Sequence, residues 1–290
     1  MTTGTAKANG IDIAYETFGD VSKPALLLVM GLGAQMIAWD EDFVQKIVDR
    51  GFYVIRYDNR DVGLSSKIEA GPQPDVAAAT RGDASSASYT LNEMADDGIS
   101  LLDALGIAKA HIVGASMGGM IVQAMAIRHP ERVLSIASIM STTGDRAVGQ
   151  ATPEAMAALT SPPPKTREEA VAAAVKSASV VAPGVAIDEA KVGEAAGRAF
   201  DRSFYPVGMA RQLVAIIASP DRTEALKKVT VPTVVIHGEA DALVTPSGGE
   251  ATAAAIPGAK LVMVPNMGHN LPDQAVPTVV DAIVENTKRA

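Results

Sequence analysis

The stretch His111-Ile-Val-Gly-Ala-Ser-Met-Gly-Gly-Met120 joins a strand-like segment to a helix-like one through glycines and one serine. Within it, Gly114–Gly118 fits the pattern Gly-x-Ser-x-Gly, which between a strand and a helix places a serine hydroxyl at the tip of a tight turn. Glycines are needed there because larger side chains would clash across the turn. A flexible turn without a chemical role is the simpler alternative, so the case for Ser116 as a nucleophile depends on finding its partners.

A serine hydroxyl is a weak nucleophile and needs a base. The chain has four histidines. His111 begins the strand that leads to Ser116, so it lies at the end of that strand far from the serine. His129 ends a helix, where an imidazole interacts favourably with the helix dipole. His237 ends a strand. His269 follows a strand on a loop near the end of the chain, which fits the order serine, acid, histidine. We therefore predict that His269 is the base.

The acid of such a triad should follow another strand and lie between the serine and the histidine. The segment His237-Gly-Glu-Ala-Asp241 offers two carboxylates, and Asp241 stands farther out on the loop. We predict Asp241, with Glu239 and Asp145 as the alternatives. Its role would be to hold the imidazole tautomer and stabilise the imidazolium.

Two backbone amides are candidates for an oxyanion hole. The amide of Met117 opens the helix after the serine, where the helix dipole also favours negative charge. The loop Met30-Gly31-Leu32-Gly33 follows the first buried strand, and its glycines would let the backbone approach a substrate oxygen. We predict the amides of Leu32 and Met117 as the two donors.

Strand-like and helix-like segments alternate along the first half of the chain. Expected strands cover residues 11–18, 25–30, 53–58, 110–113 and 133–140. Expected helices cover residues 42–50, 90–105 and 117–128. This alternation predicts an α/β fold with a mostly parallel central sheet and helices on both faces.

The alternation stops near residue 141 and returns near residue 223. Residues 141–222 are rich in alanine and lack a convincing buried strand. Beyond them, strands are expected at 233–237 and 260–264, and helices at 249–255 and 276–288. The sequence therefore predicts a core made of residues 1–140 and 223–290, with an inserted helical cap at 141–222.

The composition excludes several classes of protein. The 290 residues carry a net charge of −8, which is opposite to the basic footprint of a nucleic-acid-binding protein. The chain has no cysteine, no ligand cluster such as His-Glu-x-x-His and no apolar run of the ~20 residues that span a bilayer. We expect a cytoplasmic protein without metal, cofactor or stable membrane insertion. The sequence carries no signal for an oligomeric state.

The segment after the first buried strand also imitates a dinucleotide-binding unit. Gly31-x-Gly33 follows the strand, and Asp58 ends the next one. The third glycine of that fingerprint is replaced by Met36, however, and Trp39 intervenes before the helix. A half fingerprint is weak, so the hydrolase interpretation is preferred.

With these residues assembled, the chain resembles the α/β-hydrolases, and within them bacterial esterases and lipases related to the aclacinomycin methylesterase group. The resemblance covers essentially the full length and is carried by Val29-Met-Gly31, Ile55-Arg-Tyr-Asp-Asn-Arg-Asp-Val-Gly63, His111–Gly118, Pro232-Thr-Val-Val-Ile-His-Gly238 and Gly268-His269. It implies the α/β-hydrolase fold and serine chemistry. A serine nucleophile disfavours the dehalogenase and epoxide-hydrolase branches, which use an aspartate.

Two details of the resemblance concern single residues. Many relatives have His-Gly in the oxyanion loop, where this chain has Met30-Gly31. Because the donor there is a backbone amide, catalysis should survive, and Met30 should add an adaptable apolar wall. The turn Asp58–Gly63 is typical of the family, and we interpret Arg60 as structural, holding carboxylates or carbonyls.

The cap carries several large apolar side chains, each of which fits an ordinary cap core, but which together suggest an apolar substrate cleft. We expect the pocket to include Met30, Gly31, Phe204 and Tyr205, and to be mostly apolar. The predicted function is hydrolysis of carboxylic esters, or thioesters, of a small to medium apolar molecule. The alternatives are another reaction on the same triad (C–C bond hydrolysis, proline iminopeptidase activity or perhydrolysis) or a ligand-binding protein on a hydrolase scaffold.

Overall fold

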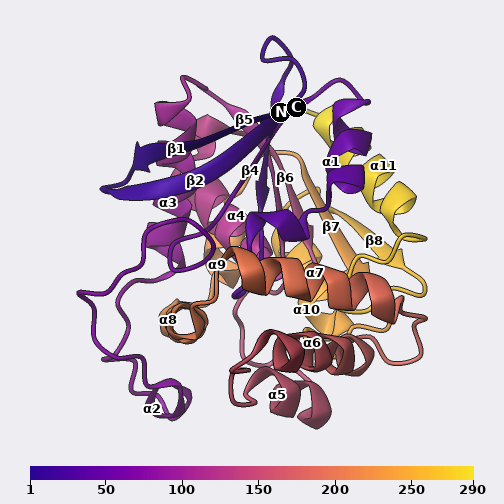
Figure 1. Cartoon of the computed structure of the whole chain (residues 1–290). Helices are drawn as coiled ribbons and strands as arrows, with labels where there is room; N and C mark the ends of the chain where they lie inside the picture. Colours follow the sequence, from indigo (N-terminus) through magenta and orange to yellow (C-terminus); the bar gives the residue numbers. More distant parts are fainter.

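The computed structural model describes residues 1–290 and contains one eight-stranded sheet (Figure 1). The strand order is β1-β2-β4-β3-β5-β6-β7-β8, and all neighbours from β4 to β8 are parallel. Only β1 and β2 run antiparallel to their partners. The strands are β1 Thr2–Ala8, β2 Ile11–Phe18, β3 Ala25–Val29, β4 Tyr53–Tyr57, β5 Ala110–Ala115, β6 Val133–Ile139, β7 Thr233–Gly238 and β8 Lys260–Val264. The predicted α/β class with a mostly parallel sheet is confirmed.

Helices cover both faces of this sheet. Helices α3 and α4 pack on one face together with α9 and α10, and α1 packs beside α11 on the other (Figure 1). These helices are α1 Glu41–Val48, α3 Leu91–Ala104, α4 Met117–Arg128, α9 Thr223–Leu226, α10 Pro246–Ala255 and α11 Val276–Thr287. Helix α3 begins with a capping box, in which the side chains of Thr90 and Glu93 accept from each other's backbone amides.

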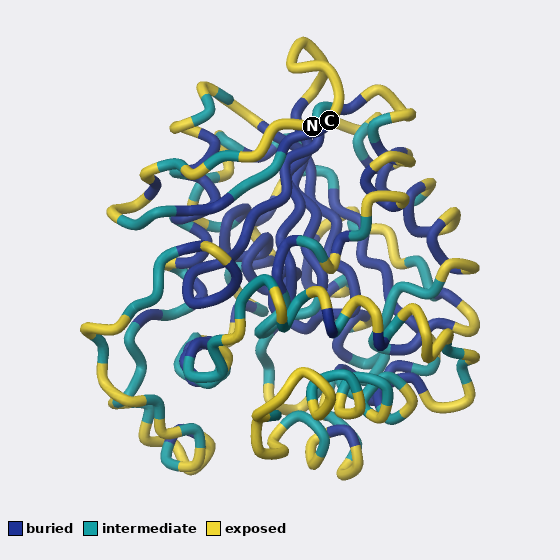
Figure 2. Tube along the Cα trace, viewed as in Figure 1, coloured by how far each residue is buried: buried dark blue, intermediate teal, exposed yellow.

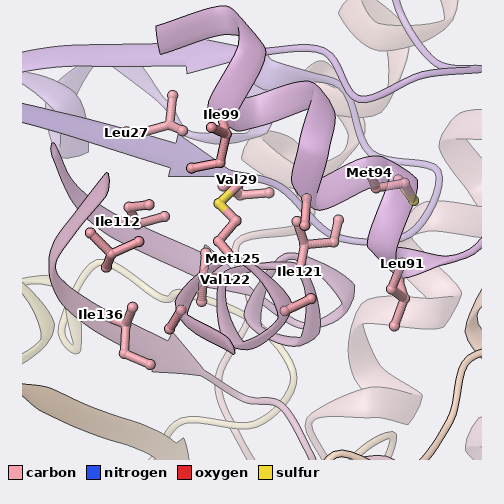
Figure 3. Packing of buried hydrophobic residues seen from close by; sticks show 14 of the residues in the cluster. Leu27, Val29, Leu91, Met94, Ile99, Ile112, Ile121, Val122, Met125 and Ile136 are labelled. Carbon is pink, nitrogen blue, oxygen red and sulfur yellow. The ribbon is translucent and has the colours of Figure 1, made fainter. Parts of the chain in front are cut away.

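The central strands are buried because both of their faces are covered (Figure 2). In β3, Leu27 and Val29 belong to the cluster beneath α3 and α4, whereas Leu26 and Leu28 belong to the cluster beneath α1 and α11. This division follows the two-residue period of a strand. Figure 3 shows the first cluster, in which Leu27, Val29 and other strand residues meet side chains of the two helices.

Between β6 and β7 the chain forms helices and no strand. The four that precede the short helix α9 are α5 Pro153–Leu159, α6 Arg167–Val181, α7 Glu189–Arg202 and α8 Pro206–Ala218. They lie together beyond one end of the sheet, opposite the end where the two termini meet (Figure 1). Helices α5 to α7 are largely exposed, and Val181 is the only buried residue of α6 (Figure 2). Helix α8, in contrast, buries five residues, with Gln212 among them. None of the helices in the structure combines the length and apolarity needed to cross a lipid bilayer.

Two elements go beyond what the sequence patterns predict. Strand β1 has little hydrophobic alternation and is half-exposed, so its pairing with β2 defines it. The turn between them is Asn9-Gly10, and both residues have positive φ (48° and 79°). The dipeptide Asn-Gly is the strongest short-range sequence signal for such a hairpin. The Gly, Pro, Ala and Ser content of residues 67–89 predicts a loop. The structure instead has a short helix within this segment, α2 Val76–Thr80, whose N-terminus is capped by Asp75.

Candidate active site

Ser116 stands at the junction of β5 and α4 in a strained backbone conformation. Its φ and ψ are 57° and −120°, a combination that costs a non-glycine residue on the order of 1–3 kcal/mol. The main chain around it is fixed, because the Ser116 amide donates to the carbonyl of Ile139 at 2.9 Å and its carbonyl accepts from Ser141 Oγ at 2.8 Å. The surrounding structure therefore holds the serine hydroxyl out of the sheet.

The glycines of this turn have a steric reason. A side chain at Gly114 would overlap the carbonyl of Gly118, and one at Gly118 would overlap the carbonyl of Val29. The pattern Gly-x-Ser-x-Gly thus reflects a turn in which β3, β5 and the start of α4 lie in direct contact. This geometry agrees with the strand–turn–helix context expected from the sequence.

The structure brings Ser116, His269 and Asp241 into one hydrogen-bonded line. His269 Nε2 lies 2.9 Å from Ser116 Oγ, and His269 Nδ1 lies 2.8 Å from Asp241 Oδ2. If Nδ1 carries the proton and donates to the carboxylate, Nε2 is free to accept the serine proton. The three side chains come from loops after β5, β7 and β8, which end at the same edge of the parallel sheet.

Asp241 is buried, with 3% of its surface exposed, and it is surrounded by donors. Its Oδ1 accepts from the amides of Leu243 and Val244, both at 2.9 Å. Burial acts to raise the pKa of Asp241, but hydrogen bonds from His237, His269 and the Val244 amide outweigh it and hold this pKa below the usual value. The carboxylate is therefore kept charged beside His269.

His237 is the part of the site that sequence reasoning missed. The sequence places it at the end of a strand, where it could lie near the site, but gives it no role; in the structure its buried ring lies beside the acid. Nε2 is 2.7 Å from the carbonyl of Val244 and 3.4 Å from Asp241 Oδ2. Because a carbonyl oxygen only accepts hydrogen bonds, Nε2 carries a proton, and this N–H lies between the two oxygens. Its spacing of four residues from Asp241 was the available signal.

The other histidines lie in different surroundings. His111 Nδ1 is 2.8 Å from Ser135 Oγ, and burial lowers the pKa of His111 to about 4. His129 Nε2 is 2.7 Å from Asp96. Neither ring bonds to Ser116 or Asp241.

The two alternative acids do not bond to His269. Glu239 is exposed and contacts its surroundings through its backbone amide, which donates to Val264. Asp145 Oδ1 accepts from the amide of Ala147 at 2.9 Å. Of the three carboxylates considered from the sequence, Asp241 alone meets the imidazole.

The two expected oxyanion donors lie where their amides are free. Neither the Leu32 amide nor the Met117 amide donates a hydrogen bond within the protein. A β-carbon built on Gly31 would lie 3.5 Å from Ser116 Oγ, so the loop that contains Leu32 runs directly against the serine. Met30, next to it, is buried, and its carbonyl accepts from Asn59 at 2.9 Å.

The expected pocket residues of the inserted segment show other contacts. The Phe204 ring packs on Phe200 with ring centroids 4.6 Å apart and remains 41% exposed. The Tyr205 hydroxyl accepts from Arg211 at 3.0 Å.

No group of three His, Asp or Glu side chains in the structure is arranged to bind a metal ion.

The inserted segment touches the loops of both the acid and the base. The carbonyl of Val181, at the end of α6, accepts from the amide of His269 at 3.0 Å and from that of Ala242 at 3.2 Å. A side chain on Gly268 would overlap Ala182. The end of α6 therefore fixes the positions of the two loops that carry Asp241 and His269.

A second group of buried charges joins the segment after β4 to α3, α7 and α8. Arg60 donates twice to Asp97, at 2.6 Å each, which agrees with the structural role expected for this arginine. Arg211 lies 3.3 Å from Asp61. Arg202 lies 2.8 Å from Asp58.

Comparisons with known proteins agree on the fold. A family model described as alpha/beta hydrolase fold matches residues 24–276. Rhodomycin D methylesterase from Streptomyces peucetius is 28% identical, over 100% of this chain and 99% of the relative. The 3-oxoadipate enol-lactonase 2 of Acinetobacter baylyi is 27% identical, over 85% and 82%. A solved structure, the enol-lactonase from Burkholderia xenovorans, is 26% identical with a TM-score of 0.74, over 98% of this chain and 100% of that one.

Proposed function

This chain belongs to the α/β-hydrolase family, and we propose that it is a serine hydrolase that cleaves carboxylic esters of a small to medium, apolar substrate. One observation carries the proposal, the line of hydrogen bonds from Asp241 through His269 to Ser116. This is the arrangement that turns a serine hydroxyl into a nucleophile. Relatives named methylesterase and enol-lactonase support the ester as the bond that is broken.

In the first half of the reaction, the serine becomes acylated. Ser116 Oγ passes its proton to His269 Nε2 and attacks the ester carbonyl carbon, whose π electrons move to oxygen. When the tetrahedral intermediate collapses, the bond to the alcohol oxygen breaks and the alcohol takes the proton from His269. The products of this half are the free alcohol and an acyl-Ser116 ester.

In the second half, water releases the acid. His269 takes a proton from water as the hydroxyl attacks the acyl carbon. The second intermediate collapses, Ser116 Oγ leaves and recovers the proton from His269, and the carboxylic acid departs. Asp241 stays ionised throughout and stabilises the imidazolium that forms in each half, in keeping with its lowered pKa.

The amides of Leu32 and Met117 would stabilise the oxyanion of both intermediates. Both are free of internal partners, and the Met117 amide also stands at the positive end of α4. Loss of one such donor typically costs on the order of 10²–10³ in kcat. Met30 takes part in no chemical step, because its carbonyl is bonded to Asn59 and its side chain is apolar.

We assign residues 141–222 the role of a cap that closes over Ser116. Their position between β6 and β7 and the contacts of Val181 with the acid and base loops support this. The cap and Met30 would supply apolar walls, with Phe204 and Tyr205 at its outer part. A carboxylic ester with a short alcohol is the substrate class that the methylesterase relative supports.

A lactone is the second candidate, because it is an internal ester and two of the similar proteins are enol-lactonases. The same steps apply, except that the alcohol stays attached to the acyl group. The two candidates differ in their products, since a methyl ester yields methanol and a lactone yields a single hydroxy or keto acid.

The test is turnover combined with active-site labelling. The wild-type protein should hydrolyse p-nitrophenyl esters and methyl esters, and an alkyl fluorophosphonate should label Ser116 and no other residue, as mass spectrometry would show. A folded protein that binds these esters without turnover, and that resists labelling, would instead be a ligand-binding protein on this scaffold.

A further inference from the structure

Gln212 of α8 contacts the oxyanion loop directly. Its side chain is fully buried. Oε1 accepts from the amide of Gly33 at 2.8 Å, and Nε2 donates to the carbonyl of Arg60 at 2.8 Å. The orientation of the amide is determined by these partners, because the flipped group would place NH₂ against an N–H and oxygen against a carbonyl.

Gly33 belongs to a turn that presents the Leu32 amide. The amide of Ala34 donates to the carbonyl of Gly31 at 3.3 Å, and Gly33 has a φ of 66°. A positive φ at this place is what a type II turn requires. Gln212 holds the Gly33 amide at the end of this turn. The Leu32 amide belongs to the preceding peptide, so it keeps its place beside Ser116 only while the turn as a whole is held in position.

Helix α8 is itself anchored on the main chain and side chains of Arg60 and Asp61. Arg211 pairs with Asp61, and Gln212 holds the carbonyl of Arg60. Gly208 lies so close to Asp61 that a side chain there would overlap its carbonyl. Met209, three residues before Gln212 on the same helix face, packs on Gly33. The helix can therefore act as a fixed support for the turn.

From these contacts we infer that Gln212 is a positioning residue for the oxyanion hole, through which α8 holds the Leu32 amide toward Ser116. The inference rests on the proposed function and adds a requirement to it. The cap completes the catalytic site, because the acceptor that locks the oxyanion turn comes from the cap. Gln212 touches no reacting atom, and its effect passes from the anchored Gly33 through the main chain of the turn to Leu32.

The test compares substitutions at Gln212. Gln212→Met fills a similar volume but removes the acceptor, so kcat should fall by about tenfold with KM little changed, which is less than the loss of a whole oxyanion donor. Affinity for a trifluoromethyl ketone, which forms an anionic adduct on a serine, should fall in parallel. Gln212→Glu keeps an acceptor for Gly33 in either protonation state, but only its protonated form can donate to the Arg60 carbonyl as the native amide does. It should therefore restore most of kcat at the acid end of the pH range in which the wild type is active.

Val214→Ala is the matched control, because Val214 is equally buried in α8 and makes no hydrogen bond to the turn through its apolar side chain. It should lower the Tm while leaving kcat and the ketone affinity unchanged. If Gln212→Met does not fold, Gln212→Asn, which is one methylene too short to reach Gly33, carries the same expectation.

The outcomes separate the two proposals. A folded Gln212→Met or Gln212→Asn with wild-type kcat and ketone affinity would overturn the positioning role while the wild type still hydrolyses esters. The positioning role is also overturned if, at the acid end of that pH range, Gln212→Glu is as impaired as Gln212→Met. Failure of the wild type to hydrolyse esters or to be labelled at Ser116 would instead overturn the proposed function.

Discussion

Two groups of buried carboxylates lie near the cap, and they have different partners. Asp241 meets two histidines and the backbone amides of its own loop. Asp58, Asp61 and Asp97 each meet an arginine. Both groups are buried to the same degree, so burial alone does not tell a catalytic carboxylate from a structural one.

The partners make the difference because they differ in proton chemistry. A guanidinium keeps its proton at any pH a protein survives, so the arginine group can only hold the chain together. An imidazole gains and loses a proton near neutral pH, so the histidine group can transfer one. We therefore expect substitutions in the histidine group to reduce turnover at constant stability, and substitutions in the arginine group to do the opposite.

The largest effect should come from Ser116→Ala, which removes the proposed nucleophile next to the histidine group. We expect kcat to fall by about 10⁶. Stability should be retained or slightly increased, since alanine removes a hydroxyl from a strained turn. Steady-state kinetics with a p-nitrophenyl ester, alongside circular dichroism, would measure both. A variant that keeps a few per cent of activity would show that Ser116 is not the nucleophile.

Asp241→Asn should have the next largest effect, about 10⁴ in kcat, because the amide would favour the wrong imidazole tautomer. Asp97→Asn provides the contrast within the arginine group and should leave kcat of the folded protein close to wild type. Fluorophosphonate labelling rates of the two variants would measure this difference. Equal losses of labelling rate in both variants would show that the histidine group and the arginine group do not differ in their effect on turnover.

Arg60→Met should affect stability rather than turnover. It leaves Asp97 buried without its bidentate partner, which typically costs about 3–5 kcal/mol in the free energy of unfolding. Urea unfolding would measure the loss. Lys7→Met is the matched control, because Lys7 pairs with Asp12 at 2.8 Å on the exposed surface and should cost little. A stable Arg60→Met would mean that this group does not hold the fold.

The extent to which the sequence predicts this site depends on how local each signal is. Ser116 is recognisable because strand, turn and helix are neighbours along the chain. His269 and Asp241 follow from chain order and from loops after strands. The contact of Gln212 with Gly33 spans 179 positions, so it depends on how α8 docks, which no local pattern encodes.

The same reasoning explains the remaining differences. The hydrogen bonds of His237 depend on the fold of its own loop, where the carbonyl of Val244 turns back toward the ring. Strand β1 exists through its ladder with β2 rather than through its own hydrophobicity. Asn9-Gly10 was a readable signal for that hairpin.

A smaller effect concerns pH. Because the pKa of Asp241 is held below its usual value, this carboxylate is already ionised where a histidine titrates, near pH ~6.5 for an unperturbed ring. The acid limb of kcat/KM should therefore rise with increasing pH and depend on a single proton. A pH profile spanning roughly 4.5 to 8 in buffers of constant ionic strength, on the order of 0.1 M, would test it. If the logarithm of kcat/KM rose with a slope of two against pH on the acid side, the Asp241 carboxylate and the His269 imidazole would titrate together.

The smallest effects should come from Glu239→Gln and Asp145→Asn, the two carboxylates near the site that belong to neither buried group. Glu239 is exposed, and the Asp145 carboxylate bonds only to the backbone amide two residues away. Removing a charge that water already solvates should change kcat by no more than about twofold. Labelling rates measured beside Asp241→Asn give the comparison directly. A severe loss in either variant would move the acid of the triad to that residue, because only a carboxylate that orients His269 can cost several orders of magnitude without unfolding the chain.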